Sequence, residues 1–232
     1  MNILITRPLI DAEDLMGKLF SLGHKIIHIP TLKILKVKAP PINLSKYDAL
    51  IFTSANAIRN LQVVKKDKNK ICFCVGAITE KIARNEGFKN TTSAGGNVNA
   101  LKNLIMNSEK IKKNSFLAYF CGDNLSSDLD IDLKKEGLNI EKIINYTSQK
   151  ITDLNEANKK IITSHPPDII FVYSSRSAES FIEITKNYTL HPIMTGSKVM
   201  CISNKVLKVF EKNNWNNLEL FEPGDELIKL EP

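Results

Sequence analysis

The sequence lacks any apolar run of the roughly 18 residues that a membrane-spanning helix requires. Its first residues, MNILITRP, also contain too short an apolar run for a signal peptide. We therefore expect a soluble, cytoplasmic protein that does not bind membranes.

Cysteine and histidine are scarce, with four of each. Cys72 and Cys74 share one apolar stretch, ICFCVG, and their spacing places both on one face of a strand. One interpretation of this spacing is a Cys-x-Cys metal site. However, no further ligands stand nearby and the histidines show no metal-ligand spacing. We therefore predict buried apolar thiols and no metal.

Strong catalytic motifs are missing as well. The chain has no recognisable Ser/His/Asp set, no paired carboxylates, and neither a Walker A nor a GxGxxG glycine pattern. The sequence therefore offers no familiar nucleophile and no phosphate-binding loop.

Arginine is rare although the chain is basic. The net charge is +7 and the sequence pI is about 9.1. Most basic residues are lysines, and the arginines are only Arg7, Arg59, Arg84 and Arg176. Because no basic stripe interleaved with aromatics is present, nucleic-acid binding is weakly supported. A polyanionic small molecule is the other partner that a basic protein can attract.

Alternating strand and helix patterns run through the whole chain. With 232 residues the chain is long for one compact unit and comfortable for two small domains. Strands are predicted at residues 2–8, 26–37, 48–54, 71–76, 116–122, 140–151, 169–175 and 198–204, with helices between them, one of them at residues 55–64. Residues 91–97 are predicted to form a loop. This alternation predicts an α/β fold with parallel sheets covered by helices on both faces.

One sequence pattern, an apolar strand followed by a polar helix start, occurs twice in the chain. The stretch YDALIFTSANAI, residues 47–58, matches PDIIFVYSSRSA, residues 167–178. Asp168 then falls under Asp48, and Ser174 falls under Ser54. The strand–helix units around these stretches form a set of three that occurs twice along the chain in the same order. We therefore predict two similar α/β halves from an internal duplication, although α/β units converge on such patterns in any case.

Small polar residues follow the predicted strands. They are Thr6-Arg7, Thr53-Ser54, Gly76 with Thr79, Cys121-Gly122-Asp123-Asn124, Ser174-Ser175-Arg176 and Ser203-Asn204. Taken singly, each hydroxyl is best explained as a helix cap. Taken together, they predict a rim that binds a polyanion at the carboxyl ends of the strands, where ligands of open parallel sheets bind.

The ordered motifs resemble the uroporphyrinogen-III synthase (HemD) family. The resemblance rests on ILITRP, YDALIFTSANAI, VGAIT, GNVNAL, CGDN, GLNIEKIINY and IIFVYSSRSA, and it extends from Asn2 to about Trp215. It implies two similar parallel-sheet α/β domains, joined by a two-stranded linker, with a cleft between them. Domain one would comprise residues 1–36 and 152–232, domain two residues 39–146, and the connectors residues near 33–40 and 146–152.

The resemblance also implies an activity. The family closes linear hydroxymethylbilane to uroporphyrinogen III with loss of water and inversion of ring D, and it uses no cofactor and no metal. The substrate carries many carboxylates, which suits a basic protein with a polar rim. A monomer is expected, with a possible transient hand-over of substrate from the preceding pathway enzyme.

Site residues are carried over by motif. Tyr146 matches the tyrosine proposed to assist departure of the hydroxyl group, and Thr79 matches the threonine of the Val-Gly-x-x-Thr motif. Substrate-binding positions are Arg7, Thr53, Ser54, Asn56, Gly76, Gly122, Ser174, Ser175, Arg176 and Ser203. Tyr146 could instead be a packed linker tyrosine, and Thr79 could bond only within its own helix turn. The chain has Asn204-Lys205-Val206 where many members carry threonines, which puts a hydroxyl role there in doubt.

Two other functions remain open at this point. A non-enzymatic binding protein for an anionic small molecule would share the rim but would not need Tyr146. A nucleic-acid-binding regulator is motivated by net charge alone.

Overall fold

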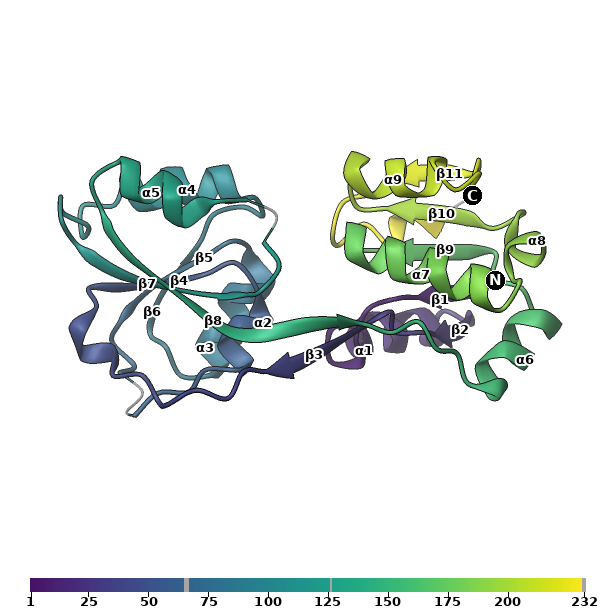
Figure 1. The fold of residues 1–232 in the computed structure, drawn as a ribbon, viewed down its shortest axis with the longest axis horizontal. Helices are drawn as coiled ribbons and strands as arrows, with labels where there is room; N and C mark the ends of the chain where they lie inside the picture. Colours follow the sequence, from purple (N-terminus) through teal and green to yellow (C-terminus); the bar gives the residue numbers. More distant parts are fainter. Residues whose placement is uncertain (65–66, 126, 231–232) are drawn as a thin grey trace. The chain divides into compact units, whose positions relative to one another are not determined.

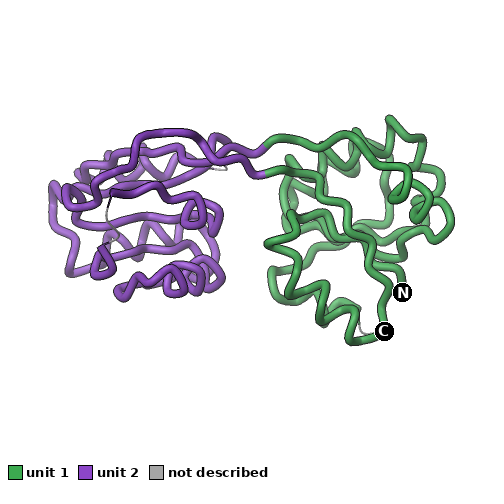
Figure 2. The backbone as a smooth tube through the Cα atoms, turned by 90° about the horizontal axis from the view of Figure 1, so that it is seen from below, with its two compact units in different colours: residues 1–33, 149–232 green, residues 34–148 purple. Residues whose placement is uncertain are grey.

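The computed structural model describes residues 1–64, 67–125 and 127–230. Its contacts divide the chain into two compact units, coloured separately in Figure 2. Unit 1 comprises Met1–Lys33 and Gln149–Pro232, and unit 2 comprises Ile34–Ser148. The chain thus leaves unit 1, builds all of unit 2, and returns.

Unit 1 contains a five-stranded parallel sheet in the order β11-β10-β9-β1-β2 (Figure 1). Its strands are β1 (Asn2–Ile5), β2 (Lys25–His28), β9 (Ile169–Val172), β10 (Lys198–Cys201) and β11 (Leu218–Leu220). Its helices are α1 (Leu9–Ser21), α6 (Glu156–Ser164), α7 (Ser175–Asn187), α8 (His191–Met194), α9 (Asn204–Glu211) and the short 3-10 turn η2 (Ile228–Leu230).

Alternate residues of these strands enter two apolar clusters, one on each face of the sheet. Leu4 and Ile170 pack with Phe181 of α7 on one face. Ile5 and Phe171 pack against α1 on the other. This two-sided burial explains why the strands are apolar at almost every position.

Unit 2 contains a six-stranded sheet in the order β3-β8-β7-β4-β5-β6. Its strands are β3 (Leu32–Lys36), β4 (Ala49–Phe52), β5 (Ile71–Cys74), β6 (Asn90–Ser93), β7 (Phe116–Gly122) and β8 (Asn139–Lys150). Its helices are η1 (Leu44–Lys46), α2 (Ala55–Arg59), α3 (Ala77–Asn85), α4 (Val98–Met106) and α5 (Leu129–Lys135). Helices α2 and α3 cover one face, and α4 and α5 cover the other. From β8 to β6 all neighbouring strands are parallel.

The two sheets share one strand order. Reading β2-β1-β9-β10-β11 beside β8-β7-β4-β5-β6 pairs β9 with β4, the two strands that hold the repeated stretches. The two aspartates of the repeat also have the same role. Asp168 accepts from the N–H of Asn2 at 2.6 Å, and Asp48 accepts from the N–H of Phe116 at 2.8 Å. Each carboxylate therefore binds the first residues of the neighbouring strand.

The predicted α/β class with parallel sheets is confirmed, and three predicted elements are wrong. Residues 26–37 form two strands, because Pro30 interrupts the run. Residues 90–93, mostly assigned to a loop, form the edge strand β6. The helix predicted for residues 55–64 ends at Arg59, because Ile42 pairs with the chain at Val63.

The cysteines are buried and free, as predicted. Cys72 and Cys74 lie in the same apolar cluster of unit 2. Burial raises the pKa of Cys74 and of Cys201 to about 12, so both remain thiols at neutral pH. Within the described ranges, no helix is both long and apolar enough to span a membrane.

Candidate functional site

In unit 2, predicted site residues lie at the carboxyl ends of three neighbouring strands, and Tyr146 lies within a fourth, opposite the last residue of β7. Tyr146 is on β8, Gly122 ends β7, Thr53 and Ser54 follow β4, and Gly76 follows β5. Parallel pairing brings these strand ends to one edge of the sheet. The structure thus gathers this part of the predicted rim.

Tyr146 and Gly122 are in direct contact. A Cβ atom added to Gly122 would lie 2.7 Å from both Cε2 and Cζ of Tyr146, and 3.0 Å from its hydroxyl oxygen. No side chain fits at position 122 while the phenol lies there. Glycine is therefore required by the close approach of the ring, and the phenol lies across the end of β7.

On the other face of the sheet, the one covered by α4 and α5, the hydroxyls of Thr53 and Tyr119 lie 3.1 Å apart. Burial raises the pKa of Tyr119 to about 12, so its hydroxyl stays protonated. Tyr119 is a residue of this edge that sequence reasoning missed, because its place inside the apolar run FLAYFCG gives no signal of a polar contact.

The residues after Thr53 begin helix α2. Ser54 Oγ accepts a hydrogen bond from the N–H of Asn56 at 3.1 Å, so its capping role is confirmed. The side-chain oxygen of Asn56 accepts from Arg59 at 3.2 Å. Both side chains therefore support the helix start.

Helix α3 begins differently. Its N-cap is Gly76, and no side chain caps it. A Cβ on Gly76 would lie 3.4 Å from the Cα of Gly96, so the loop through Gly95 and Gly96 packs closely on this turn. Thr79, in the first turn of α3, is only 6% exposed. Its burial favours a contact within the protein over direct contact with a ligand in this conformation.

In unit 1, the remaining predicted residues lie at the carboxyl ends of β1, β9 and β10. Ser174 accepts from the N–H of Ser177 at 3.1 Å, and Ser203 accepts from the N–H of Val206 at 3.4 Å. Both serines therefore cap helices, as predicted. Ser175 and Arg176 are the first residues of α7.

Arg7 stacks on an aromatic ring. Its guanidinium carbon lies 4.4 Å from the centroid of the Tyr173 ring. Burial raises the pKa of Tyr173, and the charge of nearby Glu226 raises it further, while Arg7 opposes this shift. Arg7 thus packs on Tyr173 at the end of β1.

Behind this rim lies a buried hydroxyl network that the sequence did not indicate. Thr31 Oγ1 and Ser177 Oγ lie 2.5 Å apart, and Ser177 Oγ donates to Thr6 Oγ1 at 3.1 Å. Ser180 Oγ lies 2.8 Å from the carbonyl oxygen of Thr31 and 2.6 Å from that of Ile151. The network joins α7 to the segments at which the chain leaves and re-enters unit 1.

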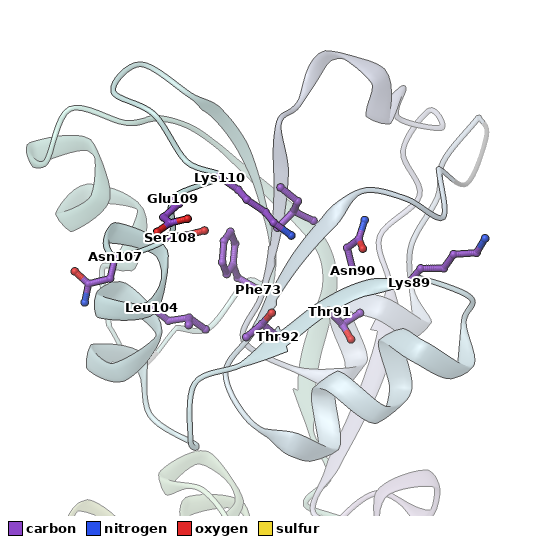
Figure 3. Close-up of a pocket in the computed structure, with 11 residues that line it drawn as sticks. Phe73, Lys89, Asn90, Thr91, Thr92, Leu104, Asn107, Ser108, Glu109 and Lys110 are labelled. Carbon is purple, nitrogen blue, oxygen red and sulfur yellow. The ribbon is translucent and has the colours of Figure 1, made fainter.

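A separate pocket of about 500 Å³ in unit 2 lies away from these strand ends. Ile71 and Asn90, the first residues of β5 and β6, line it together with the last turn of α4. Figure 3 shows Phe73 near its centre, while Lys89 extends away. The pocket therefore lies along β5 and β6, and none of the predicted rim residues lines it.

Metal-ligand clusters are absent from the described ranges, since no group of three His, Cys, Asp or Glu residues could hold an ion. The strand ends of unit 2 carry hydroxyls and the phenol of Tyr146, and those of unit 1 carry hydroxyls with Arg7 and Arg176.

The fold and these residues define a two-unit α/β protein whose polar groups collect at the carboxyl ends of parallel strands. The family described as Uroporphyrinogen-III synthase HemD matches residues 13–221. Because this match covers most of the sequence, the chain belongs to the uroporphyrinogen-III synthase (HemD) family.

Individual relatives agree with this membership. A curated protein of Methanocaldococcus jannaschii, described as "Putative uroporphyrinogen-III synthase", is 25% identical over 220 residues, covering 91% of this chain and 89% of its own. The crystal structure of the uroporphyrinogen-III synthetase of Helicobacter pylori has a TM-score of 0.62 at 15% identity and covers 99% of both chains. A mutant uroporphyrinogen III synthase of Thermus thermophilus has a TM-score of 0.57 at 12% identity, covering 97% of this chain and 93% of its own. At these identities the two structures support the fold.

Proposed function

We propose that this chain closes linear hydroxymethylbilane to uroporphyrinogen III, a step of haem biosynthesis, with loss of water and inversion of ring D. Family membership supports the reaction. The observation that carries the assignment to this site is the phenol of Tyr146 lying across Gly122, at an edge that also gathers Thr53 and Gly76. Because water is eliminated without hydrolysis or oxidation, the enzyme is a lyase.

Substrate carboxylates bind to the polar groups at the strand ends. The first turn of α3 has no side-chain cap, so its backbone N–H groups can donate to an anion. In unit 1, Arg7 and Arg176 supply positive charge. One carboxylate at a helix start gains roughly 0.3–1 kcal/mol. A micromolar complex requires about 8 kcal/mol, so several such contacts must act together.

Tyr146 assists the departure of water. Its O–H donates to the hydroxyl of the ring A hydroxymethyl group as the carbon–oxygen bond breaks, and water leaves. The remaining cation is attacked by the substituted carbon of ring D, and rearrangement followed by loss of a proton gives the inverted macrocycle. The proton returned at the end restores the phenol.

Positioning is the other contribution of the protein. Unassisted closure gives the isomer in which ring D is not inverted, so the site must hold ring D for attack at the more crowded carbon. Fixed contacts with many carboxylates can impose this orientation. Thr53, Ser54, Asn56 and the serines of unit 1 are proposed as contributors to it.

No cofactor or metal is proposed for this reaction, since a proton donor and a shaped site are sufficient. We further propose that the protein acts as a monomer in the cytoplasm. The preceding enzyme of the pathway would supply the unstable linear substrate, by free diffusion or by transient hand-over.

An isomer assay tests the function. Hydroxymethylbilane is generated by the preceding enzyme in the presence of the purified protein, the product is oxidised, and the uroporphyrin isomers are separated by chromatography. We expect type III in the presence of the protein and type I in its absence. If only the type I isomer forms when the protein is in excess over the linear substrate, the synthase activity is refuted. Tight binding of the linear compound in that case would favour an anion-binding protein instead.

A further inference from the structure

Strand β8 contains a bulge immediately before Tyr146. In its pairing with β7, Cys121 lies opposite Ile144, but the next residue, Gly122, lies opposite Tyr146. Asn145 is the extra residue, without a partner on β7. A bulge of this kind changes the direction in which the following side chain points.

The bulge decides on which face of the sheet Tyr146 lies. Ile143 and Tyr146 both pack against the cluster under α2 and α3. They are three residues apart, and in a regular strand residues three apart point to opposite faces. If the strand alternated regularly through Asn145, with no bulge, Tyr146 would point to the same face as Ile144 and could not lie across Gly122.

Asn145 is held on both sides. Its side chain is buried, with the residue only 5% exposed, and its Nδ2 donates to the carbonyl oxygen of Ala57 at 2.7 Å. That carbonyl belongs to the short helix α2, and helix ends leave such groups in need of donors. The backbone carbonyl of Asn145 accepts from the N–H of Val37 at 3.1 Å. The extra residue is therefore fixed by two segments other than β7.

The chain after Tyr146 is also held. The N–H of Asp123 donates to the carbonyl of Tyr146 at 3.2 Å, and the Asp123 carboxylate accepts from the N–H of Ser148 at 3.1 Å. The N–H and the carboxylate of Asp123 thus hold the backbone at Tyr146 and Ser148. Of these contacts, the Asn145–Ala57 bond is the one made by a side chain of the bulge itself.

We propose that Asn145 is a positioning residue for the synthase reaction, holding the bulge that places the phenol of Tyr146 across Gly122. This role rests on the proposed function, because it acts through Tyr146. The position requires a buried donor that reaches Ala57, which an asparagine amide provides. Asn145 itself binds no substrate.

Kinetics test the role first. Asn145→Ala should lower kcat by about tenfold with KM changed less than twofold, since the donor is misplaced while the carboxylate contacts remain. The matched control is Asn139→Ala. Asn139 is on the same strand and its amide also donates to a backbone carbonyl, that of Asn114 at 2.9 Å. Its loss should leave kcat unchanged.

A double mutant separates positioning from general weakening of the fold. In a Tyr146→Phe background, Asn145→Ala should lower kcat by less than twofold, because the donor it places is already gone. A full tenfold loss in that background would overturn the proposal.

A measurement on the protein without substrate tests the position of Tyr146 independently of the isomer assay. The protein is labelled with 3-fluorotyrosine at its five tyrosines, and the Tyr146 resonance is assigned by its absence in Tyr146→Phe. Asn145→Ala should move this resonance, and Asn139→Ala should not. If Asn145→Ala does not fold, Asn145→Ser, which keeps a polar group but shortens it, replaces it. An unmoved resonance refutes the positioning role, whereas a moved resonance in a protein that makes no type III product refutes only the synthase function.

Discussion

The ring of Tyr146 lies so close to Gly122 that a methyl group at position 122 would meet its Cζ at 2.7 Å. Gly122→Ala should therefore displace the phenol. The clash involves the outer end of a half-buried side chain, which can swing away, so the melting temperature should fall by only a few degrees. We expect turnover to fall at least tenfold, measured as the rate of type III formation.

Gly196→Ala is the matched control for this substitution. A Cβ at Gly196 would meet no atom within 4 Å, so neither stability nor turnover should change. Full activity of Gly122→Ala would mean that the position of the phenol across β7 is irrelevant to the reaction.

Removing only the hydroxyl of Tyr146 tests its chemistry. Tyr146→Phe keeps the ring and its packing but removes the proton donor. General-acid assistance is worth about 10²–10⁴ in rate, and water can replace part of it, so we expect a loss of about 10² in single-turnover rate. The melting temperature should stay nearly unchanged.

Tyr188→Phe is the corresponding control in unit 1. The Tyr188 hydroxyl accepts from the N–H of Leu154 at 3.0 Å, so its loss should cost about 1 kcal/mol of stability and little turnover. A wild-type rate for Tyr146→Phe would remove Tyr146 from the mechanism and leave positioning as the sole contribution.

Sequence patterns predicted the class of fold because the strands are buried on both faces. Continuous apolar runs such as ALIF and IIFV mark such strands, and the polar pairs after them mark helix starts. The repeated Asp residues form equivalent hydrogen bonds in the two units, and the repeated Ser residues both cap helices. The repeat in the sequence therefore indicated that these polar residues have the same role in each unit.

Elements that form only by pairing with another segment of the chain could not be predicted from the sequence. The residues of β6, NTTS, have no apolar alternation, and they form a strand because β5 lies beside them. The shortened α2 and the bulge at Asn145 likewise depend on segments distant in the sequence. For the same reason Asn145 could not be predicted as a candidate site residue, whereas the family motifs pointed to Tyr146 and Gly122.

Charge at the end of β1 is expected to act on binding. Arg7→Ala should raise KM by up to about tenfold, equivalent to about 1.4 kcal/mol, with kcat little changed. Arg7→Lys keeps the charge but not the planar group stacked on Tyr173, so its KM should lie between wild type and alanine. The exposed Lys18→Ala, on α1, is the control for net charge. A large fall in kcat at constant KM would contradict a binding role.

The carboxylate of Glu80 should make the stability of the protein depend on pH. Hydrogen bonds from Ser93, Arg84 and Thr91 lower the pKa of Glu80, and its side chain is only 18% exposed. A lowered folded pKa stabilises the fold above the ordinary value of the carboxyl group, and this contribution is lost as the pH falls through the folded pKa.

Glu80→Gln should accordingly destabilise the protein by about 1 kcal/mol at pH 7, a modest figure because Arg84 is largely exposed to solvent. The difference from wild type in urea unfolding should shrink below about pH 4. An equal difference at pH 7 and pH 3 would show that the charge of Glu80 makes no contribution.

The hydroxyl network of unit 1 is expected to stabilise the fold without taking part in the reaction. Ser180 is fully buried, and its hydroxyl bonds the carbonyls of Thr31 and Ile151. Ser180→Ala removes this donor. The Thr31 carbonyl keeps its bond from the N–H of Ile151, whereas the Ile151 carbonyl loses the Ser180 donor, and an unsatisfied buried group costs about 1–3 kcal/mol. Urea unfolding should show a loss of this size, whereas kcat and the proportion of type III product should remain at wild-type values at 25 °C. Thr163→Ala is the matched control, because its exposed hydroxyl bonds carbonyls of its own helix at 3.0 Å and should cost less than about 0.5 kcal/mol. If Ser180→Ala instead changed the isomer ratio at unchanged stability, the network would belong to the site and not to the framework behind it.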